Sequence, residues 1–98
     1  MFNKATVEKP DVATLINQGA LIVDVRTPGE FNAGNYPNSV NIPLQQLNQR
    51  IAELGDSKEK PVVLYCASGT RSGVASKMLK SAGFTTVVNA GGLADMPR

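Results

Sequence analysis

A lone cysteine followed five residues later by an arginine is the part of this sequence best suited to chemistry. Cys66 is the only cysteine in the chain, and the stretch around it reads Cys66-Ala67-Ser68-Gly69-Thr70-Arg71. The nucleophilic form of cysteine is the thiolate, and a nearby cation or a helix N-terminus lowers a cysteine pKa from about 8.5 into roughly the 3.5–7.5 range. Arg71 supplies a permanent positive charge at the end of this stretch. The pattern indicates a loop that holds a reactive thiolate.

Two elements must position this loop. The run Pro61-Val62-Val63-Leu64-Tyr65 is short and apolar, which predicts a strand buried on both faces of a sheet. Ser72-Gly73 opens a helical pattern, so Cys66 falls at a turn from strand to helix. Ligands of open parallel sheets bind at the carboxyl ends of strands, where the first turn of a helix also offers unpaired N–H groups to an anion. The alternative interpretation is that Cys66 is a small buried core residue.

Composition limits the other functions open to the chain. Its 98 residues predict one domain, residues 1–98, with one core. The net charge of +2, from ten basic and eight acidic residues, is too small and scattered for nucleic-acid binding but suits a small anionic substrate. The sequence has no histidine, which excludes a Cys-His dyad and the usual zinc sites. We therefore expect no metal and no other cofactor.

The N-terminal residues carry no targeting signal that we identify. Residues 1–8 lack the apolar segment of a signal peptide, and no run approaches the ~18 apolar residues of a membrane span. We expect no membrane partner and a cytoplasmic location, or a periplasmic one if a leader was removed ahead of residue 1.

Helical and strand patterns alternate along the chain. Helices are predicted at 9–19, 28–34, 43–54 and 72–82, strands at 21–25, 40–42, 61–65 and 86–89, and a closing turn or short helix at 91–98. Such alternation predicts an α/β fold with a mainly parallel central sheet and helices on both faces. In the last long helix the spacing predicts one buried face, made of Val74, Ala75, Met78, Leu79 and Ala82.

Two motifs near the first strand have structural explanations. Thr27-Pro28-Gly29-Glu30 is a capping box with proline at the first helical position, which accounts for Glu30 without a catalytic role. Asp24 and Arg26 lie two residues apart and therefore point to one side of an extended chain. Their simplest interpretation is an ion pair at the end of the strand.

Five motifs, in this order and spacing, resemble a single-domain rhodanese. The ending is similar to the phage-shock type of thiosulfate sulfurtransferase. The motifs are Leu21-Ile22-Val23-Asp24-Val25-Arg26, Glu30-Phe31, Asn41-Ile42-Pro43, the Cys66–Ser72 loop and Asn89-Ala90-Gly91-Gly92-Leu93. The resemblance spans about residues 9 to 92 and implies one rhodanese-like domain, in which Asp24 and Arg26 lie beside the thiol loop and support Arg71 or the loop backbone. The chain departs from the family at Asn35 and Pro37-Asn38, where histidine and a Pro-Gly pair are common, and it lacks a tryptophan after Gly92.

The spacing of the loop favours sulfur transfer over phosphate chemistry. Cysteine phosphatases have a similar loop with five residues between cysteine and arginine, whereas four separate Cys66 from Arg71. We expect double displacement: the Cys66 thiolate takes the outer sulfur of thiosulfate, releases sulfite, and passes the persulfide sulfur to cyanide, a thiol or a protein thiol. An ionised thiol needs no general base, in agreement with the absence of histidine.

The loop residues are expected to bind the donor. The N–H groups from Ala67 to Arg71 would stabilise the terminal sulfur, at about 3 kcal/mol per well-placed donor, and Arg71 would attract the sulfonate. Ser68 and Thr70 either add hydroxyl hydrogen bonds or serve only as small turn residues. Two alternatives stay open: a persulfide carrier or partner-binding domain without turnover, and an arsenate reductase or phosphatase on the same fold.

Overall fold

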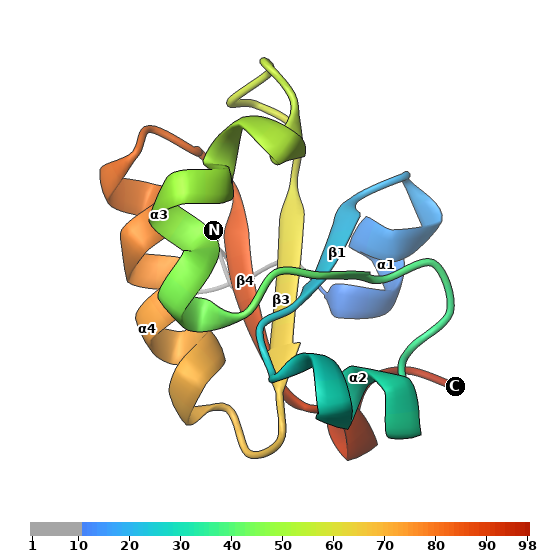
Figure 1. Cartoon of the computed structure of the whole chain (residues 1–98). Coiled ribbons are helices and arrows are strands. Elements are labelled where there is room, and N and C mark those ends of the chain that lie inside the picture. The colour runs from blue at the N-terminus through green and yellow to red at the C-terminus, as the bar shows by residue number, and fades with distance from the viewer. Residues whose placement is uncertain (1–10) are drawn as a thin grey trace.

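A four-stranded parallel sheet forms the centre of the molecule (Figure 1), in a computed structural model that describes residues 11–98. The strands lie in the order β2-β1-β3-β4, and all three pairings are parallel. Their bounds are β1 Leu21–Asp24, β2 Val40–Asn41, β3 Val62–Cys66 and β4 Val87–Gly92. Every residue of β3 is buried. Cys66 is the last residue of this strand and therefore lies at the carboxyl edge of the sheet, as predicted.

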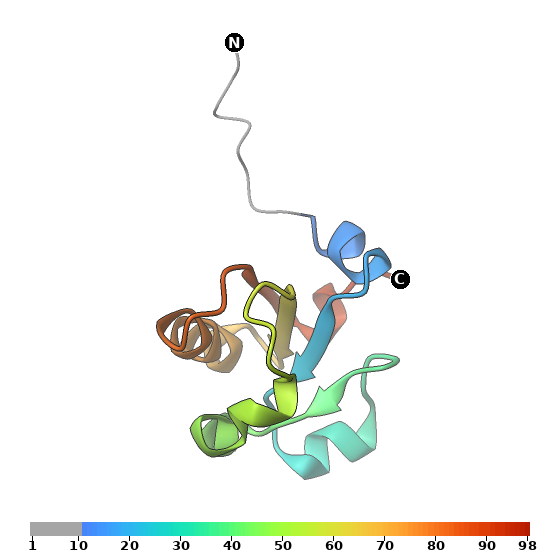
Figure 2. The ribbon, with the colours of Figure 1, turned by 90° about the horizontal axis from the view of Figure 1, so that it is seen from above.

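Helices cover both faces of the sheet (Figures 1 and 2), which confirms the predicted α/β architecture. On one face Val62, Leu64 and Cys66 join a core with residues of the 44–54 helical segment and of α4 (Thr70–Ser81). On the other face Val63 and Tyr65 pack with residues of α1 (Val12–Asn17) and the 93–96 segment. This division follows from the alternation of side chains along a strand.

The local signals of the sequence set the helix boundaries. Asp11 accepts a hydrogen bond from the Thr14 N–H and caps α1. Thr27 and Glu30 form the predicted capping box of α2 (Pro28–Ala33), which ends at Gly34. The predicted helix at 43–54 is built from three consecutive pieces, the 3-10 turn η2 Leu44–Gln46, α3 Leu47–Arg50 and the 3-10 turn η3 Ile51–Leu54. Residues 9 and 10 of the first predicted helix lie outside the described residues.

Two predictions about the C-terminal half were wrong. Val74 is 48% exposed, and the buried positions of α4 are instead Ser72, Ala75, Ser76 and Leu79. Those positions follow the helical period, whereas Val74 points away from them. Strand β4 continues to Gly92 and does not end at residue 89, because Gly92 pairs with Cys66. The short 3-10 turn η4 (Leu93–Asp95) follows directly.

The described helices are all short or polar. Between residues 11 and 98, none combines the length and apolarity required to span a bilayer.

Candidate active site

The sulfur of Cys66 accepts hydrogen bonds from the start of α4. Cys66 Sγ lies 3.0 Å from the Gly69 nitrogen, 3.4 Å from the Ser72 nitrogen and 3.4 Å from Ser72 Oγ. Burial is the largest single influence and raises the pKa of the thiol. The hydrogen bonds from the Ser72 hydroxyl and from the N–H groups of Ser72, Ser68 and Gly69 outweigh burial and bring the pKa to about 7. A large part of the thiol is therefore ionised at neutral pH.

The loop owes its shape to glycines in two separate segments. Gly69 has a φ of 100°, a left-handed conformation that directs its N–H toward the sulfur. A Cβ on Gly69 would lie 3.3 Å from Gly91 Cα, and a Cβ on Gly92 would overlap the carbonyl oxygen of Ala67. The Gly91-Gly92 pair thus allows β4 to lie directly behind the loop.

Ser72 and Asn89 tie the loop to β4. Ser72 Oγ donates to Asn89 Oδ1 at 2.6 Å, and Asn89 Nδ2 donates to the Gly69 carbonyl oxygen at 3.0 Å. A hydroxyl has one proton, so Ser72 divides it among Asn89, the Cys66 sulfur and the Gly91 carbonyl oxygen, with Asn89 the closest acceptor. Neither residue was expected to contact the sulfur. The only signals for them were the small residue at 72 and the position of Asn89 ahead of the glycine pair.

Glu30 holds Arg71. Arg71 Nη1 lies 2.7 Å from Glu30 Oε1 and Arg71 Nη2 lies 3.0 Å from Glu30 Oε2, which is a bidentate ion pair. The hydrogen bond from Arg71 and those from Thr27 lower the pKa of Glu30 to about 2. The capping-box interpretation of Glu30 is confirmed but incomplete, because the same carboxylate also fixes the arginine at the rim of the loop.

Asp24 and Arg26 form the ion pair that their spacing predicts. Arg26 Nη2 lies 2.7 Å from Asp24 Oδ2, and the two side chains are 9% and 0% exposed. Arg26 Nη2 also donates to the Gly34 carbonyl oxygen at 2.7 Å. Within residues 11–98 neither side chain is hydrogen-bonded to Arg71, which binds Glu30. The charge of Asp24 acts on Arg71 only through space, where it adds to the rise in pKa that Glu30 causes. The expected support of Arg71 or of the loop backbone by this pair stays a prediction.

The remaining predicted site residues lie on the exposed rim. Ala67, Ser68 and Thr70 are exposed, and Ser68 Oγ lies 3.4 Å from Thr70 Oγ1. In the described part of the chain their hydroxyls form no hydrogen bond with Cys66. Their contribution to substrate binding stays a prediction.

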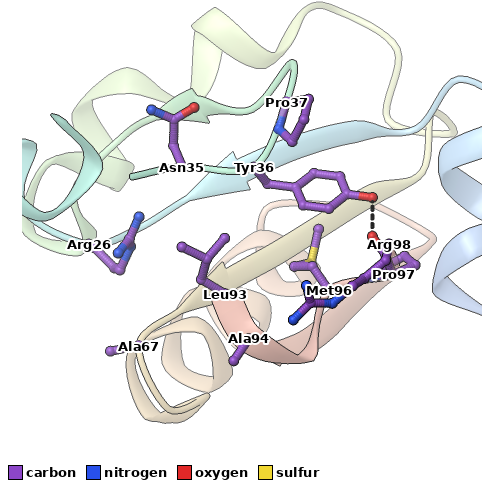
Figure 3. A pocket seen from close by; sticks show the side chains of 10 residues that line it. All are labelled: Arg26, Asn35, Tyr36, Pro37, Ala67, Leu93, Ala94, Met96, Pro97 and Arg98. Atoms are coloured by element: carbon purple, nitrogen blue, oxygen red, sulfur yellow. Dashed lines mark hydrogen bonds between the residues drawn. The ribbon is translucent and has the colours of Figure 1, made fainter. Parts of the chain in front are cut away.

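A groove of about 730 Å³ opens beside the loop (Figure 3). It lies between residues 35–37 and residues 93–98, with Arg26 and Ala67 toward one end. Tyr36 and Pro97 face each other across it, and Tyr36 Oη donates to the Pro97 carbonyl oxygen at 2.6 Å. Asn35, where the sequence departs from the rhodanese pattern, lines the groove and donates to the Phe31 carbonyl oxygen at 2.9 Å. No local sequence pattern predicts this groove, because its two walls are far apart in the chain.

The arrangement suits nucleophilic chemistry at sulfur. Neutral donors surround the Cys66 sulfur, a cation lies at the rim, and a groove leads away from the loop. In the portion of the chain that the structure describes, no three histidine, cysteine, aspartate or glutamate side chains gather in a way that would hold a metal ion.

Comparison with known proteins identifies related chains. A family model described as a rhodanese-like domain matches residues 8–96. The thiosulfate sulfurtransferase PspE of Escherichia coli K12 is 39% identical over 74 residues, which cover 76% of this chain and 71% of that protein. A sulfurtransferase of Allochromatium vinosum is 33% identical over 89 residues, covering 91% of this chain and 81% of that protein. The solved structure of a rhodanese with anions from E. coli superposes with a TM-score of 0.75 at 38% identity, covering 81% of this chain and 95% of that one.

Proposed function

Because this chain belongs to the rhodanese-like domain family, we propose that it is a thiosulfate sulfurtransferase that carries the sulfur as a persulfide on Cys66. The supporting observation is the set of N–H and O–H donors that surround the Cys66 sulfur and lower its pKa to about 7. These donors stabilise a thiolate without a neighbouring base. They are also positioned to stabilise the charge on a second sulfur bound to the first.

The first half-reaction loads the enzyme. The Cys66 thiolate attacks the outer sulfur of thiosulfate, an Sγ–S bond forms, and the S–S bond of thiosulfate breaks. Its electron pair leaves with sulfite. The new terminal sulfur carries the negative charge and lies near the loop, where the N–H groups of Ala67 through Arg71 are expected to bind it.

The second half-reaction unloads the enzyme. A thiophilic acceptor, either cyanide or a thiolate, attacks the terminal sulfur and forms a bond to it. The Sγ–S bond breaks, and its electron pair returns to Cys66 as the thiolate. In each step the electron pair of the broken bond leaves with sulfite or returns to Cys66, so no electrons enter or leave the system and no redox cofactor is required.

Arg71 attracts the donor from the rim of the loop. Its Nη1 and Nη2 atoms each donate one hydrogen bond to Glu30, and its side chain is 33% exposed. The Nε–H and the positive charge remain available to the sulfonate, although Glu30 reduces that charge. We therefore expect Arg71 to contribute more to capture of thiosulfate than to the transfer step. The solved E. coli rhodanese is a structure with anions, in keeping with a site that favours negative ligands.

Intact-mass measurement tests this function directly. The purified protein and its Cys66→Ser variant are incubated with thiosulfate and then with cyanide. We expect a gain of one sulfur atom, about 32 Da, that requires Cys66 and disappears with cyanide. Repeated cycles with both substrates would give thiocyanate in excess of enzyme. A protein that gains one sulfur and then releases it to neither cyanide nor a thiol would be a carrier, and a protein that never gains the sulfur is no thiosulfate sulfurtransferase.

A further inference from the structure

The two edges of the sheet differ in how they are protected. At one edge, β2 is only two residues long, and Pro37 and Pro43 flank it in the chain. At the other edge, outside β3 in Figure 1, β4 has six residues, and the segment 84–92 around it contains neither a proline nor a charged residue. Short length, proline and charge are the usual devices that prevent an edge strand from pairing with another chain. The edge at β4 has none of them.

The backbone of β4 offers free hydrogen-bonding groups along this edge. The Val62 N–H donates to the Thr86 carbonyl oxygen at 2.9 Å, and alternate residues of a parallel strand face the same neighbour. The N–H and C=O groups of Val87 and Asn89 therefore face away from β3, and among residues 11–98 no strand lies on that side. The regular edge ends at Asn89, because the Gly91 N–H donates to Asn89 Oδ1 and the pairing with β3 is irregular there.

The edge is held in a fixed position by its side chains. Val87 packs in the core on one face of the sheet, and Val88 packs in the core on the other face. The side chain of Asn89 donates to the Gly69 carbonyl oxygen, so the edge ends beside the Cys66 loop. A strand fixed in this way can pair with a further strand without rearrangement.

The charge next to this edge is positive. Residues 67–94, which comprise α4 and β4, include three basic residues and no acidic one. Arg71 is bound by a carboxylate, whereas Lys77 and Lys80 are exposed and form no ion pair in the described part of the chain. The 56–60 loop, which bonds to the segment ahead of β4, has two acidic and two basic residues and adds no net charge.

Both free lysines lie on the side of α4 that faces β4. A Cβ on Gly73 would lie 3.4 Å from Asn89 Nδ2, so this position marks the side of the helix toward β4. Lys77 and Lys80 follow Gly73 by four and seven residues, and residues at these spacings share one side of a helix. A chain that pairs with β4 therefore lies near two lysines.

We propose that the edge of β4 binds an extended acidic segment of a partner protein, which adds a strand to the sheet. The backbone of that segment pairs with the N–H and C=O groups of Val87 and Asn89, and its carboxylates lie against Lys77 and Lys80. Charge favours such a partner over a second copy of this chain, which carries the same lysines. This docking goes beyond sulfur transfer, because it requires neither Cys66 nor thiosulfate.

Pairing is tested with an acidic peptide and its basic counterpart. The peptide Glu-Glu-Thr-Val-Thr-Val-Glu-Glu, with blocked ends, is titrated into the isotope-labelled protein and followed by NMR. We expect chemical-shift changes and slowed hydrogen exchange at the amides of Val87 and Asn89, because their N–H groups gain an acceptor. The peptide Lys-Lys-Thr-Val-Thr-Val-Lys-Lys has the same strand pattern and should bind about fivefold more weakly, since its charges oppose those of α4.

A double substitution tests the contribution of charge. Lys77→Gln with Lys80→Gln leaves the backbone of β4 intact and should weaken binding of the acidic peptide about fivefold. The matched control is Gln45→Glu with Gln49→Glu, which changes the net charge equally at exposed positions of the 44–54 segment and should change binding little.

Three results of the titration would overturn the proposal: no binding of the acidic peptide, equal affinities for the two peptides, or shifts in α4 without any at Val87 and Asn89. Slowed exchange at these two amides that depends on protein concentration, without peptide, would also overturn it, because a second copy would then occupy the edge. All of these measurements use the protein without thiosulfate, so their outcome is independent of the proposed function.

Discussion

Two anions at neighbouring strand ends are stabilised in opposite ways. Asp24 ends β1, is fully buried, and is neutralised by Arg26 through contacts of 2.7 to 3.0 Å. Cys66 ends β3, is equally buried, and receives hydrogen bonds from the loop and from Ser72. The arginine nearest to Cys66 in sequence, Arg71, is instead bound to Glu30.

The difference explains which of the two anions can react. A carboxylate in a buried bidentate ion pair has a fixed charge and fixed geometry, and separating the pair is costly. A thiolate held by neutral dipoles can be protonated, can form a bond and can return to its starting state without leaving a cation unpaired. The Asp24–Arg26 pair therefore supports the fold, whereas the surroundings of Cys66 suit a thiolate that reacts and is restored.

The largest effect is expected from breaking the buried pair. Asp24→Ala removes the carboxylate partner of Arg26, whose side chain is only 9% exposed. We expect the free energy of unfolding to fall by about 3–5 kcal/mol, measured by urea denaturation. The matched control is Glu53→Ala, which removes the exposed Arg50–Glu53 pair and should change stability little. If Asp24→Ala is as stable as the wild type, the Asp24–Arg26 pair does not support the fold, and its contrast with the Cys66 loop is wrong.

Ser72→Ala is expected to lower stability less than Asp24→Ala does, but to change the reactivity of the Cys66 thiol clearly. The variant loses the hydroxyl 3.4 Å from the sulfur, while Asn89 Oδ1 keeps its hydrogen bond from the Gly91 N–H at 2.9 Å. The pKa of Cys66 should rise from about 7 toward its ordinary value, because fewer hydrogen bonds then offset the increase that burial causes. The pH midpoint of alkylation by iodoacetamide should move upward with it, so that the variant reacts more slowly than wild type at neutral pH.

Ser76→Ala is the matched control for Ser72→Ala. Ser76 is also buried in α4, but its hydroxyl donates to the Gly73 carbonyl oxygen and not to sulfur. Its alkylation midpoint should equal that of wild type. An unchanged midpoint in Ser72→Ala would mean that the backbone N–H groups alone set the pKa of Cys66.

Local contacts were predictable from the sequence, and distant ones were not. The capping box and the Asp24–Arg26 pair join residues two or three apart, and the strand that ends at Cys66 is marked by its own apolar run. The Ser72–Asn89 and Arg71–Glu30 contacts join residues 17 and 41 positions apart, so no local pattern specifies them. Val74 was misplaced because α4 buries small polar residues, and its apolar residues alone do not fix its rotation.

The smallest effect is expected from Glu30→Gln, which frees the charge of Arg71. Glutamine can still satisfy the Thr27 N–H, so the capping box and α2 are retained. The wild-type carboxylate, with a pKa of about 2, stays ionised until the pH falls toward that value, and it therefore offsets Arg71 throughout the neutral range. With that charge removed, the KM for thiosulfate at saturating cyanide should fall about two- to fivefold, because exposed ion pairs are weak. The rate of persulfide discharge should stay the same, since Glu30 does not contact Cys66 and does not line the groove beside the loop. A KM that rises would show the opposite role, in which Glu30 is a positioning residue that holds Arg71 where the sulfonate binds.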